Sequence, residues 1–184
     1  MVFRVEESVL DKFFKNRESL IKQFKKGDIT KKKFLEEHYK FIQRLNLKPF
    51  NNGIDSFEKG IYNYQYYNML AKYSCMKSKG AKLQAKHPQL ALRLQKDSQY
   101  YYSQKDNATV KLLEYLKFNN VEAYFIKVQS AFLKDKLFEI VLHDYDNVIF
   151  HSISSWLLQR LRDEGIFLEV RKKSVIDKYI NEKY

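Results

Sequence analysis

Two histidines and a glutamate in the C-terminal third have side chains that could bind a metal ion or transfer protons. Residues 137–153 predict a β-hairpin that carries His143 before its turn and His151 after it. If the turn takes residues 144–146, Glu139 lies opposite His151, and both share a face with His143. We favour this register because it gathers apolar residues on the other face. A register slipped by one residue puts the two histidines on opposite faces.

The sequence offers little else that points to catalysis. A His-His-Glu set can bind a metal ion, but its spacing here matches no known ligand motif, and a polar sheet face is the simpler interpretation. Ser154 and Ser155 fit simple helix capping, although the free N–H groups of a helix start can also hold an anion. Cys75 has no identifiable histidine partner. Because phosphate-binding glycine loops, nucleophile elbows and zinc motifs are also missing, we favour a protein without enzymatic activity, cofactor or bound metal.

The stretch between Glu58 and Asp97 has the most distinctive chemistry of the chain. It contains eight lysines and arginines and no carboxylate. Helical surfaces commonly mix charges of both signs. At 100° per residue, the rings and the lysines of the predicted helix fall on opposite sides. Proteins that bind single strands interleave rings and cations in one groove, so we expect the rings here to face a core.

The cations of this stretch form a candidate anion-binding face, for which nucleic-acid backbone is the commonest partner. Its residues are Lys72, Lys79, Lys82, Lys86, Arg93 and Lys96. The alternative is an ordinary solvated surface. Of the 34 basic residues in the chain 27 are lysine, whereas specific phosphate recognition favours the planar fork of arginine.

The tyrosines of the same region suggest a second candidate site. No phenylalanine occurs between Phe57 and Phe118, so every ring there carries a hydroxyl, and buried hydroxyls need partners. The rings could form a half-wet helix interface or line a polar pocket for a small ligand. The candidate pocket residues are Tyr62, Tyr66, Tyr73 and Tyr101. Tyr64 and Tyr67 leave the predicted core sector, and His38, beside two glutamates, is expected at the surface.

The N-terminal residues predict a helical hairpin over residues 6–45. Gly27 is a natural left-handed end for the first helix, and Thr30 is a plausible N-cap for the second. The segment resembles the helical hairpins known as short C-terminal domains, through Gly27, Ile29, Thr30 and Phe34. That resemblance implies self-association. Lys33 stands where those hairpins usually have an acidic residue, and the segment lies at the opposite end of the chain.

The remaining pattern predicts an α+β fold, with helices first and a small, mainly antiparallel sheet of three or four strands after them. We expect long helices over residues 56–86 and 88–117, the first with Asp55 as its N-cap, and a seam at residues 119–120. Residues 121–184 then form a small α+β region, and both regions share one core. The expected strands cover 121–128, 136–143, 148–153 and 166–170, with one or two short helices among or after them.

Composition limits the functional classes. The 184 residues carry a formal charge of +12, placed as +6 over residues 1–50, +6 over 51–120 and zero over 121–184. A single cysteine and no recognisable signal segment favour the cytosol, and no run is long and apolar enough to span a membrane. The leading hypothesis is a cytosolic binding module of bacterial type for an anionic partner. The alternatives are a self-associating structural protein and a small-ligand binder or enzyme with a tyrosine-lined pocket.

Overall fold

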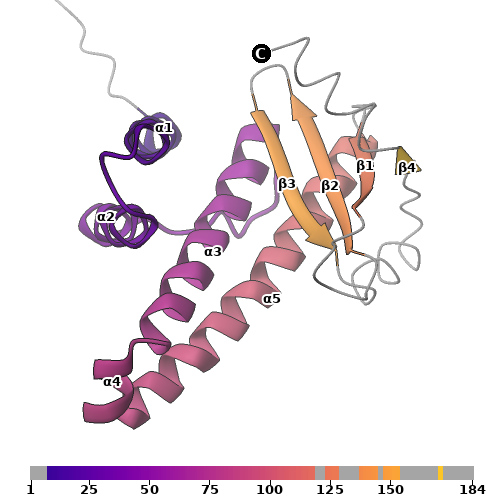
Figure 1. Cartoon of the computed structure of the whole chain (residues 1–184). Helices are drawn as coiled ribbons and strands as arrows, with labels where there is room; N and C mark the ends of the chain where they lie inside the picture. Colours follow the sequence, from indigo (N-terminus) through magenta and orange to yellow (C-terminus); the bar gives the residue numbers. More distant parts are fainter. Residues whose placement is uncertain (1–7, 119–122, 129–136, 145–146, 154–169, 172–184) are drawn as a thin grey trace, which may run out of the picture. The chain divides into compact units, whose positions relative to one another are not determined.

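The fold was analysed in a computed structural model, which describes residues 8–118, 123–128, 137–144, 147–153 and 170–171. The chain divides into two compact units, residues 1–109 and 110–184. Figure 1 shows the helices of the first unit in indigo to magenta and the strands of the second in orange to yellow. The division falls within a single long helix, α5 (Pro88–Phe118), whereas the sequence predicted a seam after it.

Two helices form the N-terminal hairpin. Helix α1 (Val9–Lys26) is capped by the Ser8 side chain and ends at Gly27, whose φ of 81° is the left-handed conformation that glycine adopts without strain. Helix α2 (Lys31–Arg44) begins at Thr30, whose hydroxyl accepts a hydrogen bond from the Lys33 N–H at 3.1 Å. The sequence predicted both ends of this turn correctly, because capping depends on short-range geometry.

Helices α3 (Phe57–Ser78), α4 (Ala81–Lys86) and the first part of α5 complete the unit. The N-cap of α3 is Ser56, whose hydroxyl accepts from the Lys59 N–H, and not Asp55, which forms an ion pair with the Lys59 amine at 2.8 Å. At its other end, the helix that the sequence predicted to reach residue 86 is interrupted after Ser78, and α4 begins at Ala81. Figure 1 shows α4 as the short helix that connects α3 and α5.

The core of the first unit lies where α1, α2 and α3 meet. Phe13, Ile42, Tyr62 and Met69 are each at most 2% exposed. The Phe13 ring stands edge-on to Tyr62, with centroids 4.7 Å apart. Leu35, Leu47, Tyr66 and Leu70 complete the buried cluster. Rings of this size provide much of the apolar burial that stabilises a unit of about 100 residues.

Side-chain hydrogen bonds fasten the connecting segments to α3. Asn63 binds both backbone groups of Phe50, accepting from its N–H at 2.8 Å and donating to its carbonyl at 2.9 Å. This amide therefore satisfies the backbone of a loop that would otherwise lose its hydrogen bonds on burial. Helix α5 is tied to α3 by the buried Ser98 hydroxyl, which donates to the Ala71 carbonyl at 3.0 Å.

The second unit contains a four-stranded sheet. Its strands are β1 (Ala123–Val128), β2 (Leu137–Asp144), β3 (Asn147–Ile153) and β4 (Val170–Arg171), in the spatial order β3-β2-β1-β4. The pairs β1–β2 and β2–β3 are antiparallel, and β4 pairs with β1 in parallel. The short helices expected near residues 156–164 and 174–180, and the capping serines Ser154 and Ser155, lie outside the described residues.

The α+β class predicted for the chain is wrong for its main described part. Of the described residues up to 115, 81% are helical and none is in a strand. We correct the class of this part to helical. The physical reason is that α1, α2 and α3 already bury their apolar faces against one another around Phe13, Ile42 and Tyr62, so this core closes without a sheet.

Candidate functional site: a basic surface and an interhelix cation cluster

The turn from α3 through α4 to α5 has a locally fixed backbone. The Ser78 hydroxyl donates to the Cys75 carbonyl at 2.8 Å, and the Gln84 side-chain amide donates to the Ser78 carbonyl at 3.0 Å. Gly80 precedes α4, and a Cβ there would stand 3.3 Å from the Lys77 carbonyl oxygen, closer than most such contacts. These interactions hold α4 across the end of α3 and so position the lysines that it carries.

Five of the six predicted anion-binding residues are exposed at this turn and at the start of α5. We call them the tip surface: Lys79, Lys82, Lys86, Arg93 and Lys96. None of them forms an ion pair with any carboxylate that the structure describes. No acidic residue occurs between Glu58 and Asp97. Asp97 lies four residues after Arg93 on α5, and no ion pair between the two is among those that the structure describes.

Several lysines elsewhere in the unit do have acidic partners. Lys33 and Lys40 both reach Glu37, at 2.9 and 3.1 Å. Lys77, two residues before the tip surface, reaches Glu36 of α2 at 3.0 Å. Other exposed lysines of the unit, such as Lys12 and Lys32, also lack a described ion pair. The tip surface is distinguished by the absence of any carboxylate in residues 59–96, so its potential is less compensated by nearby residues of the sequence.

Lys72, the sixth predicted residue, lies in different surroundings. Its side chain keeps an exposed surface, but protein around the amine lowers its pKa, and the nearby charges of Lys31 and Arg17 lower it further. We therefore remove Lys72 from the tip surface. It belongs to a group of cations between the helices that the sequence analysis did not identify.

This group, the interhelix cluster, consists of Arg17 of α1, Lys72 of α3 and Lys105 of α5. The Lys105 amine lies 5.2 Å from the centre of the Tyr102 ring and 5.7 Å from that of Tyr64. Burial lowers the pKa of Lys105 to about 8, and the charge of Lys72 contributes. Burial also lowers the pKa of Arg17 to about 10. The charge of Lys72 thus acts on Lys105, and that of Arg17 acts on Lys72.

His38 lies beside this cluster and is fully buried, so the expectation of a surface histidine is wrong. Its ring centroid is 5.1 Å from that of Phe13 and 6.0 Å from that of Phe34. Neither ring nitrogen has a hydrogen-bond partner among the described residues. Burial lowers the pKa of His38 to about 3, and the charge of Arg17 lowers it further. The imidazole is therefore neutral at physiological pH.

Spacing along the helices could have identified three of these residues. His38 lies four residues after Phe34 and four before Ile42, on the apolar side of α2. Arg17 lies four residues after Phe13 on α1, and Lys105 lies four residues after Tyr101 on α5. A polar or charged residue on an apolar stripe is a signal in itself, because it must be buried or redirected. Lys72 lies off any such stripe, and its sequence gives no comparable signal.

The four tyrosines of the candidate pocket pack against one another and their neighbours. Tyr62 is fully buried, and its hydroxyl donates to the Lys48 carbonyl at 2.9 Å. Tyr66 stacks on Tyr62, and burial raises its pKa to about 12. Tyr73 stacks on Tyr39, with ring centroids 3.8 Å apart, and Tyr101 packs against the buried cluster. The Tyr62 hydroxyl thus has a backbone partner and needs no ligand.

One further ring, Tyr64, corrects the predicted pattern of exposure, and Tyr100 is an exposed ring on α5. Tyr64, expected outside the core sector, is only 3% exposed, and burial raises its pKa. Tyr100 is 58% exposed. It follows Lys96 by four residues and Arg93 by seven on α5, so the three residues lie on one side of that helix.

The register of the β2–β3 hairpin differs from the one we favoured. Ile140 pairs with His151, Glu139 pairs with Ser152, and Asp144 pairs with Asn147 across a two-residue turn. The favoured three-residue turn is therefore wrong, and the register slipped by one residue is observed. Positions 143 and 151 then alternate to opposite faces of the hairpin. The side chains of Glu139, His143 and His151 lie outside those that the structure describes.

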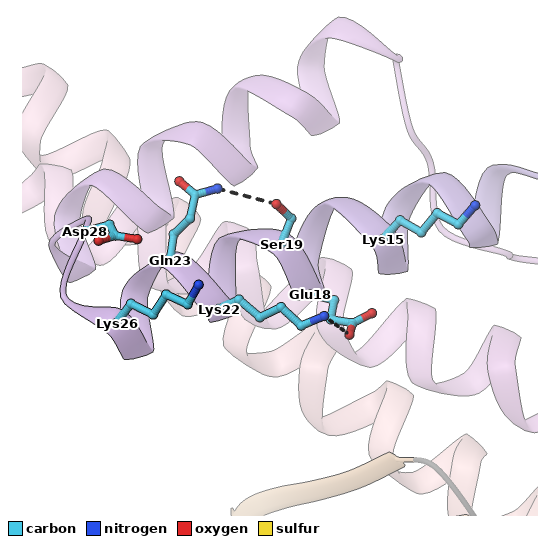
Figure 2. Close-up of a pocket in the computed structure, with 7 residues that line it drawn as sticks. All are labelled: Lys15, Glu18, Ser19, Lys22, Gln23, Lys26 and Asp28. Atoms are coloured by element: carbon cyan, nitrogen blue, oxygen red, sulfur yellow. Dashed lines mark hydrogen bonds and ion pairs between the residues drawn. The ribbon is translucent and has the colours of Figure 1, made fainter.

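A surface hollow of about 350 Å³ lies along α1 and the turn after it, as Figure 2 shows. Two pairs on its wall already interact: Lys22 with Glu18 at 2.8 Å, and the Gln23 amide with the Ser19 hydroxyl at 3.4 Å. Lysines and carboxylates both line the hollow, so their charges largely cancel and it does not attract a ligand of one sign.

Two wider features of the described residues bear on function. No three of their histidines, cysteines, aspartates and glutamates are grouped so as to hold a metal ion. None of their helices is both long enough and apolar enough to cross a membrane.

Comparison with known proteins identifies a family but no activity. No curated protein and no solved structure matches the chain. Residues 3–184 match the model of a protein family described as "Family of unknown function (DUF6648)". Since the match covers nearly the whole sequence, the chain belongs to this family of unknown function.

Proposed function

We propose that this chain is a non-enzymatic binding module that holds a polyanion, most readily the backbone of a nucleic acid, on the tip surface. The observation that carries the proposal is the set of five exposed cations with no ion pair to any described carboxylate. Such a surface attracts a polyanion and gains entropy when counterions leave the bound phosphates.

The kinds of side chain indicate how the polyanion is bound. Four of the five cations are lysines, which act as flexible point charges, whereas arginine forks read phosphates and bases in fixed geometries. Contacts of this kind position a backbone without reading its sequence. We therefore expect binding that tolerates any base sequence and weakens steeply with salt.

Tyr100 favours single-stranded nucleic acid among the candidate polyanions. Its exposed ring lies on the same side of α5 as Arg93 and Lys96. An exposed ring beside cations can stack on an unpaired base, and such stacking is worth about 1–3 kcal/mol per base. The buried tyrosines of α3 cannot take this role.

Self-association remains a prediction without specific support. Phe13, Leu35 and Ile42 of the hairpin are buried in the core of its own unit and are not free to form the interface that the hairpin resemblance implies. Val9, Phe24 and Leu45 of the hairpin remain exposed. The cytosol, expected from the single cysteine, is the compartment in which we place the binding module.

Neutralising three lysines of the tip surface should weaken binding. We expect Lys79→Gln, Lys82→Gln and Lys86→Gln together to reduce the affinity for a fluorescent 20-nucleotide single strand by at least about tenfold at 50 mM salt. The physical reason is that a protein with fewer phosphate contacts releases fewer counterions from the nucleic acid when it binds. Fluorescence anisotropy titrations measure the effect. All three side chains are exposed, so the fold should remain intact.

A matched triple variant provides the control. Lys12→Gln, Lys25→Gln and Lys32→Gln remove the same net charge from exposed positions of α1 and α2. This variant should bind nearly as well as the unaltered protein. Equal losses in both triple variants would show that only total charge matters and would contradict the proposed surface, as would a lack of binding by the unaltered protein at low salt.

A further inference from the structure

A second cavity lies in the segment that connects α2 to α3, at the start of α3. We call it the loop hollow, and its volume is about 450 Å³. Its wall includes Phe50, Asn51, Asn52, Gly53, Asp55 and Lys59. The volume falls in the range of about 300–1,000 Å³ that is usual for small-ligand sites. All of these residues belong to the first unit.

Two buried side chains of α3 hold the loop that forms this hollow. Asn63, which is 5% exposed, accepts from the Phe50 N–H at 2.8 Å and donates to the Phe50 carbonyl at 2.9 Å. The fully buried Tyr62 donates its hydroxyl to the Lys48 carbonyl at 2.9 Å. Because both anchors belong to a helix of the core, the wall is ordered before a ligand arrives, and such preorganisation lowers the entropic cost of binding.

The wall of the loop hollow carries no net charge. Its two charged residues are Asp55 and Lys59, and the Lys59 amine lies 2.8 Å from one oxygen of the Asp55 carboxylate and 2.9 Å from the other. The same amine lies 5.3 Å from the centre of the Phe50 ring. A charged ligand would have to compete with an ion pair that is already formed, so this wall favours a neutral ligand.

Hydrogen-bond donors and acceptors are both plentiful on this wall. The side chains of Asn51 and Asn52 are exposed, and each amide has two N–H donors and a carbonyl acceptor. The Asp55 carboxylate binds one amine and keeps further acceptor sites. A hydroxyl group donates and accepts at once, so a ligand with several neighbouring hydroxyls complements such a wall.

We propose that the loop hollow binds one monosaccharide unit, with its hydroxyls bonded to Asn51, Asn52 and Asp55 and its C–H groups packed on Phe50. A sugar ring is neutral, with hydroxyls around its edge and C–H groups on its faces. The half-buried Phe50 ring offers an apolar contact for those C–H groups. The residues of this site are distinct from the tip surface, so the inference does not depend on the polyanion proposal.

Glucose, galactose, mannose, ribose and N-acetylglucosamine are the probes for this site. Backbone amide signals in NMR spectra of the full chain should shift at residues 50–59 with at least one of these sugars, saturating with a dissociation constant on the order of 1 mM. Because the ligand is neutral, this constant should change by less than about twofold between 50 and 200 mM salt.

A double variant tests the assigned side chains. Asn51→Ala with Asn52→Ala should weaken sugar binding by at least about tenfold, because it removes two or more hydrogen bonds to the ligand. Both side chains are exposed, so the fold should remain intact. The matched control, Gln89→Ala with Gln99→Ala, removes two exposed amides from α5 and should keep the original affinity.

Three results would overturn the proposal. They are no saturable shift at residues 50–59 with any of the five sugars, equal sugar affinity in the double asparagine variant, or stronger binding there by glycine or inorganic phosphate than by every sugar. The triple glutamine variant at Lys79, Lys82 and Lys86 should keep sugar binding while it loses nucleic acid. Failure of the loop hollow can therefore be told apart from failure of the tip surface.

Discussion

Replacement of His38 by phenylalanine should stabilise the protein by about 1–3 kcal/mol at pH 7. Both ring nitrogens of His38 are buried without a hydrogen-bond partner among the described residues, and a buried polar group in this state costs about that much. Phenylalanine has a similar shape and suits the neighbouring rings of Phe13 and Phe34. Because phenylalanine is slightly larger, His38→Leu serves as a second variant that cannot overfill the site.

The advantage of the His38 variants should grow in acid. Burial lowers the pKa of His38 from 6.5 to about 3, so the unfolded chain binds a proton at pH values where the folded chain does not. Stability therefore falls as the pH drops from about 6.5 towards 3. Between pH 6.5 and 5 this linkage amounts to about 2 kcal/mol. The variants lack the group and should lose this part of the pH dependence.

Urea denaturation at pH 7 and pH 5 measures both effects. His87→Phe is the control, since His87 is exposed and its replacement should leave the stability at pH 7 nearly unchanged. If His38→Phe and His38→Leu both unfold with the same acid sensitivity as the original protein, His38 is not the buried neutral group described here.

Lys105→Met is expected to stabilise the protein by about 1–3 kcal/mol at pH 7. Lys105 is half-buried, and its amine has no carboxylate partner among the described residues. Methionine keeps the length of the side chain and its contacts with Tyr64 and Tyr102 but carries no charge. Lys12→Met, at an exposed site, should leave the stability within about 0.5 kcal/mol of the original value.

The same variant should alter stability in mild alkali. The pKa of Lys105 falls from 10.5 to about 8 in the folded protein. Below pH 8 the Lys105 amine is protonated in both the folded and the unfolded state, so the full cost of burying its charge is present. From about pH 8 the folded state releases this proton first, and the stability therefore rises with pH. Buried tyrosines such as Tyr66 act in the opposite direction only from about pH 10. Denaturation at pH 7.5 and pH 9.5 should therefore show a rise that Lys105→Met lacks, and an identical rise in both proteins would contradict the assignment.

Local signals in the sequence gave reliable predictions where short-range geometry decides the structure. Gly27 and Thr30 end and start their helices as expected, because a left-handed residue and a capping hydroxyl act within one turn. The N-cap of α3 is Ser56, one residue after the predicted Asp55. Such shifts follow from side chains that compete for the same N–H groups, and Asp55 had a lysine to pair with.

Tertiary contacts decided the features that the sequence did not predict. Tyr64 left the core sector of an isolated α3 but is buried, because α5 brings Lys105 over its ring. The β2–β3 register depended on the length of one turn, and the apolar pattern favoured a length other than the observed one. Lys72 differs from the other residues of the candidate anion-binding face because the charges of Arg17 and Lys31, on other helices, act on it. The residue pattern of α3 alone cannot predict such an interaction.

The salt dependence of nucleic-acid binding tests the central claim most directly. For a single strand the logarithm of the binding constant falls with the logarithm of salt concentration by about 0.7 for each phosphate contact. Anisotropy titrations of the original protein and of the Lys79, Lys82 and Lys86 triple glutamine variant, from 50 to 200 mM salt, give both slopes on one 20-nucleotide single strand. We predict a slope shallower by about 2–3 in the variant; equal slopes would contradict a polyanion site on the tip surface.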